Sequence, residues 1–156
     1  MGQFCSFPST LRSAALLLLL LPLFGGTACT SSPPQISIEG PTAELSPAFL
    51  GVVSVYFTVR NDGGRDALTG VTAGLPNALV ELHDVQNNRM AKVDRIPVPG
   101  RGELKLRPGG FHLMAFNLPR SLKEGDQLAL TLRFERSGER HVTARVVRAG
   151  GGPRQD

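Results

Sequence analysis

Apolar and polar residues alternate at a period of two in several separate stretches of this 156-residue chain. The clearest stretches are 53–59, 128–134 and 142–146, where valine, leucine, alanine or phenylalanine fills every second position. This pattern is typical of β-strands that bury one face. No window of useful length has the 3.6-residue period of an amphipathic helix. The chain is therefore predicted to be all-β.

Turn-forming residues separate further candidate strands. Glycine, proline and asparagine cluster at 61–64, 99–100, 108–110 and 137–138, as expected of turns. Between the turns, strands are expected at 68–73, 78–86, 89–98, 103–107 and 111–118. Eight or nine short strands joined in this way predict a single domain, folded as a Greek-key β-sandwich or barrel.

The N-terminal segment has the features of a signal peptide, predicted over residues 1–28. Its apolar stretch, 14–24, is too short to span a bilayer, which needs about 20 residues. Small residues then lead to Cys29, in a pattern that resembles a bacterial lipobox. We expect Cys29 to be acylated, and ordinary cleavage near Ala28 is the alternative. The protein is accordingly predicted to be periplasmic or otherwise extracytoplasmic, and anchored to the membrane by lipid.

The remaining boundaries follow from composition. Residues 29–40 begin with a polar, proline-rich run and are predicted to be a flexible tether. Residues 41–148 form the predicted domain, and the glycine-rich residues 149–156 a disordered tail.

Cysteine usage and charge exclude several classes of function. The only cysteines, Cys5 and Cys29, lie in or at the edge of the targeting segment, which excludes zinc ribbons, iron–sulfur sites and thiol nucleophiles from the domain. The formal net charge is +4, but lysines and arginines are spread singly and not in runs. We expect no nucleic-acid partner, and a monomer.

Two histidines and two methionines lie between residues 83 and 114. His112 and Met114 are two apart on one predicted strand, so their side chains leave the same face. Asn87-Asn88 is a candidate two-residue hairpin turn, because asparagine tolerates positive φ. Such a turn places Met90 opposite Val85 and diagonal to His83, about 7–8 Å away.

Imidazole and thioether ligands suit Cu(I), a soft ion, whereas methionine is a poor zinc ligand. Composition and spacing also allow another interpretation, in which the methionines fill the core and the histidines lie on the surface. His141 is expected to be such a surface residue.

The chain resembles the periplasmic copper chaperones of the PCu(A)C family. The resemblance lies in His83, Met90, a gap of 21 residues, and His112-Leu113-Met114, and it extends over residues 50–147. It implies a cupredoxin-like fold and Cu(I) binding by His83, Met90, His112 and Met114. It also implies delivery towards the CuA subunit of cytochrome oxidase or another copper-transfer protein. Two departures are the Asp84 that follows the first histidine and the shorter His83–Met90 spacing.

Transfer of copper by ligand exchange needs no general acid, base or nucleophile, so the domain is expected not to be an enzyme. A blue-copper electron carrier or oxidase would need a cysteine thiolate in the fold. The main alternative is a metal-free β-sandwich that serves as the interaction module of a lipoprotein.

Overall fold

The computed structural model describes residues 32–151, so the expected signal peptide and Cys29 lie outside the described residues. The described part of the chain contains no helix long and apolar enough to cross a membrane. Its ordered elements are ten β-strands: β1 (Ile36–Leu45), β2 (Val53–Asn61), β3 (Asp66–Ala73), β4 (Leu79–Gln86), β5 (Arg89–Lys92), β6 (Ile96–Val98), β7 (Gly102–Leu106), β8 (His112–Phe116), β9 (Gln127–Phe134) and β10 (Gly138–Val147). The prediction of an all-β domain is confirmed.

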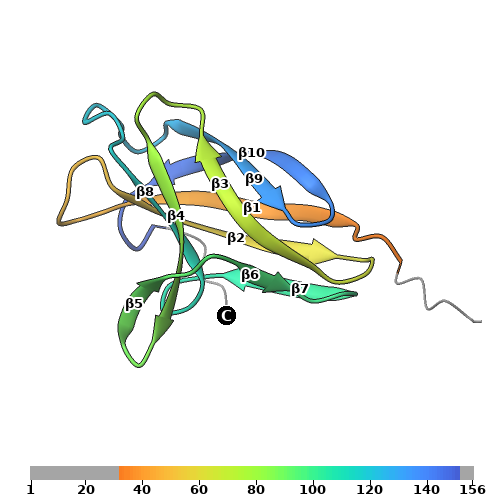
Figure 1. The fold of residues 1–156 in the computed structure, drawn as a ribbon. Helices are drawn as coiled ribbons and strands as arrows, with labels where there is room; N and C mark the ends of the chain where they lie inside the picture. The colour runs from red at the N-terminus through yellow and green to blue at the C-terminus, as the bar shows by residue number, and fades with distance from the viewer. Residues whose placement is uncertain (1–31, 152–156) are drawn as a thin grey trace, which may run out of the picture.

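All ten strands belong to one strongly curved sheet (Figure 1). The hydrogen-bonded order is β5-β4-β8-β2-β1-β10-β9-β3-β6, and β7 also pairs with β2. β7 and β8 follow one another along the same edge of β2, β7 at Phe57–Asn61 and β8 at Val53–Val55. β1 and β10 run parallel, and every other pair is antiparallel. The curvature brings β3 close to β4 and β6 close to β7.

The core consists of the apolar residues that alternate along the strands. On β2 and β9 the predicted inward positions are all buried, namely Val53, Val55, Phe57, Val59, Leu128, Leu130, Leu132 and Phe134. Residues between them are half-buried or exposed. Burying a valine, leucine or phenylalanine side chain stabilises a fold by about 1.5–3 kcal/mol. The period-two pattern therefore determines which face of each strand points outward.

The predicted tether is shorter than 29–40. Residues 36–40 are part of β1, because Ile36 and Ile38 pair with β2 and pack against the core. The tether prediction for residues 36–40 is therefore wrong. The expected strand 89–98 is two strands, since β5 pairs with β4 whereas β6 pairs with β3. In the predicted tail, the Gly150 N–H donates to the Glu44 carboxylate at 2.6 Å.

Asn61 fixes the start of β1 against the loop that follows β2. Its side chain is fully buried and satisfied: Oδ1 accepts from the amides of Gln35 and Gly63, and Nδ2 donates to the carbonyls of Gly64 and Pro99. Replacing Asn61 by an apolar residue would leave these buried backbone groups without partners and lower the stability of the domain. The segment immediately before β1 is thereby held at one end of the barrel.

Candidate metal centre

The two histidines come together because β4 and β8 are antiparallel neighbours. Leu82 lies opposite Leu113 in this ladder, and His83 lies opposite His112. Both leucines are buried in the core. Since side chains alternate between faces, both histidines project from the outer face of the sheet.

The two imidazole rings form a close pair. Their centroids are 5.7 Å apart and the ring planes are inclined by 41°. His112 is only 4% exposed, and the His83 side chain only 12%. Tyr56 lies 6.4 Å from the His112 ring and Phe116 lies 6.5 Å from the His83 ring, centroid to centroid. The pair therefore lies on an outer face that aromatic side chains largely shield from water.

A hydrogen bond within the preceding turn sets the tautomer of His112. Its Nδ1 lies 2.8 Å from the carbonyl oxygen of Gly110. A carbonyl can only accept, so the proton is on Nδ1 and the lone pair is on Nε2. Burial lowers the pKa of His112 below its ordinary value, although the bond to Gly110 opposes this shift. The ring is therefore neutral at physiological pH.

His83 is held by a carboxylate on its own strand. Its Nε2 lies 3.2 Å from Glu81 Oε2 and donates to it, while Glu81 Oε1 accepts from Lys92 Nζ at 2.7 Å. The hydrogen bonds from Lys92 and then from His83 lower the pKa of Glu81. His83 Nδ1 is buried and has no hydrogen-bond partner among the described residues. Burying a nitrogen without a hydrogen-bond partner lowers the stability of a fold. Here the unpartnered Nδ1 leaves a lone pair that can bind a metal.

Met114 lies on the same outer face as the histidines. It is two residues after His112 on β8, opposite Glu81 of β4 and Ser54 of β2. Ser54 Oγ donates to the Met114 sulfur at 3.2 Å. The Met114 side chain is half-buried on this face.

Met90 lies on the β4–β5 hairpin in the register expected from the sequence. Asn87 and Asn88 have φ of 51° and 59°, and Val85 lies opposite Met90. This puts Met90 on the face that carries His83, as its diagonal neighbour. Its side chain is 55% exposed at the edge of the sheet.

The four predicted residues thus share one face, with His83, His112 and Met114 on adjacent strands and Met90 at the edge. His141 lies apart on β10, exposed and hydrogen-bonded to Thr131. Within residues 32–151 no three His, Cys, Asp or Glu side chains are grouped so as to hold a metal.

Sequence reasoning missed the supporting residues Ser54, Glu81 and Lys92. Glu81 could have been found, because it is two residues before His83 on a predicted strand and so shares its face. Ser54 carries no such signal, since it meets Met114 across 60 residues of sequence.

Comparison with known proteins decides the family. The model of the family described as "Putative lipoprotein LpqE-like" matches residues 36–146. The chain belongs to the LpqE-like family. The chain is also similar to "Putative lipoprotein Lxx21020" of Leifsonia xyli subsp. xyli. The two are 26% identical over 136 residues, which cover 80% of this chain and 81% of the relative.

Solved structures share the fold of this LpqE-like domain. The copper-bound PCuAC domain from PmoF2 matches with a TM-score of 0.63 and 26% identity, over 75% of this chain and 96% of that domain. The Cu(I) form of DR1885 from Deinococcus radiodurans matches with a TM-score of 0.59 and 25% identity, over 77% and 82% of the two chains. The LpqE-like domain therefore has the cupredoxin-like β fold of PCuAC domains, as the sequence resemblance implied.

Proposed function

We propose that this domain binds one Cu(I) ion outside the cytoplasm and passes it to another protein. The observation that supports this most directly is the facing pair His83 and His112, with the buried His83 Nδ1 unpartnered among the described residues and Met114 on the same face. The ligands would be His83 Nδ1, His112 Nε2 and the Met114 sulfur, with Met90 as a fourth. All four are neutral, which suits a soft monovalent ion.

The hydrogen bonds around the imidazoles support the same assignment. Metal-binding histidines generally donate their second ring nitrogen to a carboxylate or a backbone carbonyl, which fixes the tautomer. His83 does so to Glu81, and His112 to Gly110. The family and structural matches also favour a metal carrier over an enzyme.

Copper would leave by ligand exchange. Met90 lies on the edge strand β5 and is the most exposed of the four side chains, so an incoming sulfur ligand could replace it first. We propose the CuA centre of cytochrome oxidase as the acceptor, or another copper-transfer protein. Acylation at Cys29 would confine this search to the membrane surface, in the periplasm or its equivalent.

A competition titration tests the proposal. Cu(I) would be titrated against a chromophoric chelator under reducing, anaerobic conditions, and X-ray absorption would count the nitrogen and sulfur neighbours. We expect one Cu(I) per chain with two nitrogens and two sulfurs. His112→Ala and Met114→Ala should each weaken binding while circular dichroism stays unchanged. Met90→Leu should remove one sulfur neighbour.

Matched variants away from the site control for general effects. His141→Ala should leave Cu(I) affinity unchanged, since this imidazole lies on β10. Absence of Cu(I) uptake would overturn the proposal and favour a metal-free interaction module. If the His112 and Met114 variants unfold and the parent chain takes up no copper, these residues serve the stability of the fold and the proposal is likewise overturned.

A further inference from the structure

Arginines gather at the end of the barrel where the described chain begins. An open cavity of about 550 Å³ is lined there by Ser32, Gly63, Gly64, Arg65, Gly100, Arg101 and Arg136. A second cavity, of about 600 Å³, shares Arg65 and Arg136 and adds Arg95. The lining residues of the first cavity come from the loops after β2, β6 and β9 and from the segment that precedes β1, and Arg95 comes from the connection between β5 and β6. The fold therefore assembles a basic surface that is not apparent along the sequence.

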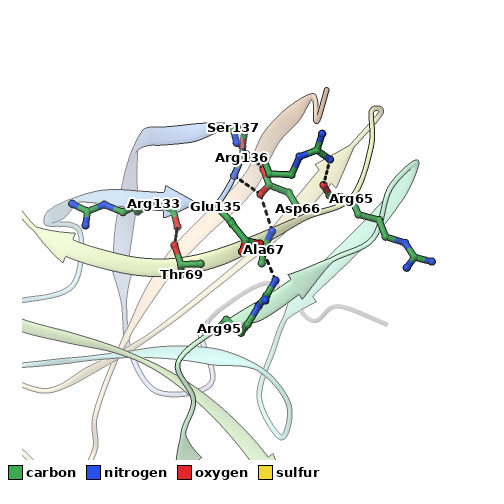
Figure 2. A network of polar contacts seen from close by, with 9 residues as sticks. All are labelled: Arg65, Asp66, Ala67, Thr69, Arg95, Arg133, Glu135, Arg136 and Ser137. Atoms are coloured by element: carbon green, nitrogen blue, oxygen red, sulfur yellow. Dashed lines mark hydrogen bonds and ion pairs between the residues drawn. The ribbon is translucent and has the colours of Figure 1, made fainter. Parts of the chain in front are cut away.

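The first cavity is lined by three cationic side chains. None of its lining residues is acidic. Arg65, Arg101 and Arg136 are exposed, and none of the three forms an ion pair with a carboxylate in residues 32–151. The Arg136 guanidinium instead donates to the carbonyl of Arg65 at 2.8 Å, which holds it beside Arg65 (Figure 2).

The carboxylates of the second cavity are already engaged. Asp66 accepts hydrogen bonds from the amides of Ala67, Arg136 and Ser137 and from the Ser137 hydroxyl (Figure 2). Glu135 pairs with Arg95 at 2.9 Å. Asp66 keeps its negative charge, because all of its hydrogen-bond donors are neutral. The three guanidinium groups of the first cavity therefore exceed this one carboxylate by two charges.

The chain enters the domain at this same cavity. The Ser32 carbonyl accepts from the Gly64 amide at 3.1 Å, and a Cβ at Gly63 or Gly64 would overlap the backbone of Pro33 or Ser32. Only glycine therefore allows this close approach of the two segments. Cys29 is three residues earlier in the sequence, and three residues span at most about 10 Å. A lipid on Cys29 would therefore hold this end of the domain close to the bilayer surface, where attraction to anionic headgroups acts over a Debye length of about 8 Å in physiological salt.

We propose that this surface, formed by Arg65, Arg101 and Arg136, binds the phosphate groups of anionic phospholipids. Guanidinium groups suit phosphate oxygens because they donate two parallel hydrogen bonds. Docking would orient the barrel with β1 rising from the membrane. The proposal depends on membrane attachment near residue 29 and not on copper binding. Free inorganic phosphate offers the same chemistry and has to be distinguished experimentally.

Vesicle co-sedimentation tests the proposal without copper. The mature chain from residue 29, which contains all ten strands, would carry Cys29→Ser so that no lipid holds it. We expect binding to phosphatidylcholine vesicles with 30% phosphatidylglycerol at least tenfold stronger than to phosphatidylcholine alone. Because each arginine near an anionic surface contributes about fivefold to partitioning, Arg65→Gln with Arg101→Gln should weaken binding by about 25-fold.

A matched double variant separates the site from net charge. Arg120→Gln with Lys123→Gln removes the same charge from the connection between β8 and β9, near the far end of β1, where both side chains are exposed, and should change binding by less than twofold. Equal losses in the two double variants would overturn the proposal, as would equal binding to both vesicle types. Vesicle binding abolished by 5 mM inorganic phosphate at constant ionic strength would instead assign the cavity to a soluble phosphate, and would overturn the membrane assignment.

Discussion

The hydroxyl of Ser54 on β2 donates a hydrogen bond to the thioether sulfur of Met114 on β8, with 3.2 Å between Oγ and Sδ. This contact links strand β2 to a proposed copper ligand on the neighbouring strand β8. It restricts the rotation of the methionine side chain, which otherwise has three rotatable bonds.

Replacing Ser54 should weaken copper binding without unfolding the domain. In Ser54→Ala the Met114 side chain loses its restraint, and we expect Cu(I) affinity to fall by about tenfold, as for other residues that support metal ligands. The unfolding free energy should change by less than about 1 kcal/mol. Ser54→Thr keeps a hydroxyl and should retain most of the affinity. If the alanine and threonine variants bind Cu(I) equally well, the hydroxyl has no part in the site.

Glu81 should act on copper through His83. Glu81→Leu removes the acceptor that keeps the proton on His83 Nε2, so the ring can rotate or change tautomer, and we expect Cu(I) affinity to fall by about 10-fold or more. Glu81→Gln retains an oxygen acceptor and should fall less. Nitrogen-15 NMR of the imidazole would report the tautomer directly, with Nε2 protonated in the parent chain. An unchanged tautomer in the leucine variant would contradict this role.

The Asn87-Asn88 turn should control the order of β5. Both residues have positive φ, which a β-branched residue adopts only at a cost of about 1–2 kcal/mol. Asn88→Val should therefore speed hydrogen exchange of the amides at Arg89–Lys92, and should lower Cu(I) affinity if Met90 is a ligand. Asn88→Gly fits the turn and is the matched control. Equal exchange rates in the valine and glycine variants would show that the turn does not hold the strand.

Asp66 should make the domain less stable in acid. Burial alone raises the pKa of this carboxyl, but its hydrogen bonds from Ser137, Arg136 and Ala67 outweigh burial and hold the pKa below its ordinary value. The ionised Asp66 carboxylate therefore contributes fully to the unfolding free energy above the unfolded-state pKa of Asp, about 3.9. This contribution is lost as pH falls through the lower pKa that Asp66 has in the folded domain. Unfolding free energies from denaturant titrations between pH 7 and pH 2 would measure it.

Asp66→Asn provides the corresponding mutational test. The new amide group would meet donors where a carboxylate oxygen now accepts, and we expect a loss of about 2 kcal/mol at pH 7 together with a flatter acid profile. Glu135→Gln, which breaks only an exposed ion pair with Arg95, should cost less than about 1 kcal/mol. A similar loss in both variants would mean that Asp66 has no special role.

The strands that follow from local pattern were predictable from the sequence. Alternation identifies the buried faces of β2 and β9, and the Asn87-Asn88 turn correctly predicts that Val85 lies opposite Met90. Local pattern does not predict the pairing of His83 with His112, because that pairing requires β4 to lie beside β8. Only the resemblance to PCu(A)C chaperones predicted that the two histidines belong to one site.

Contacts between distant segments account for what the sequence did not predict. The parallel pairing of β1 with β10 and the pairing of β6 with β3 follow from how the sheet closes. The attachment of Ser32 to the loop at Gly63 and Gly64 depends on the absence of side chains there, and a proline-rich run by itself indicates only flexibility.

Both imidazoles of the facing pair take their orientation from a partner two positions earlier in the chain, Glu81 for His83 and Gly110 for His112. Ring orientation is therefore encoded within three consecutive residues in each case, on β4 for His83 and in the turn that leads into β8 for His112. The two tripeptides are a transplantable unit: placed opposite one another in an unrelated antiparallel ladder, they should present the same two lone pairs.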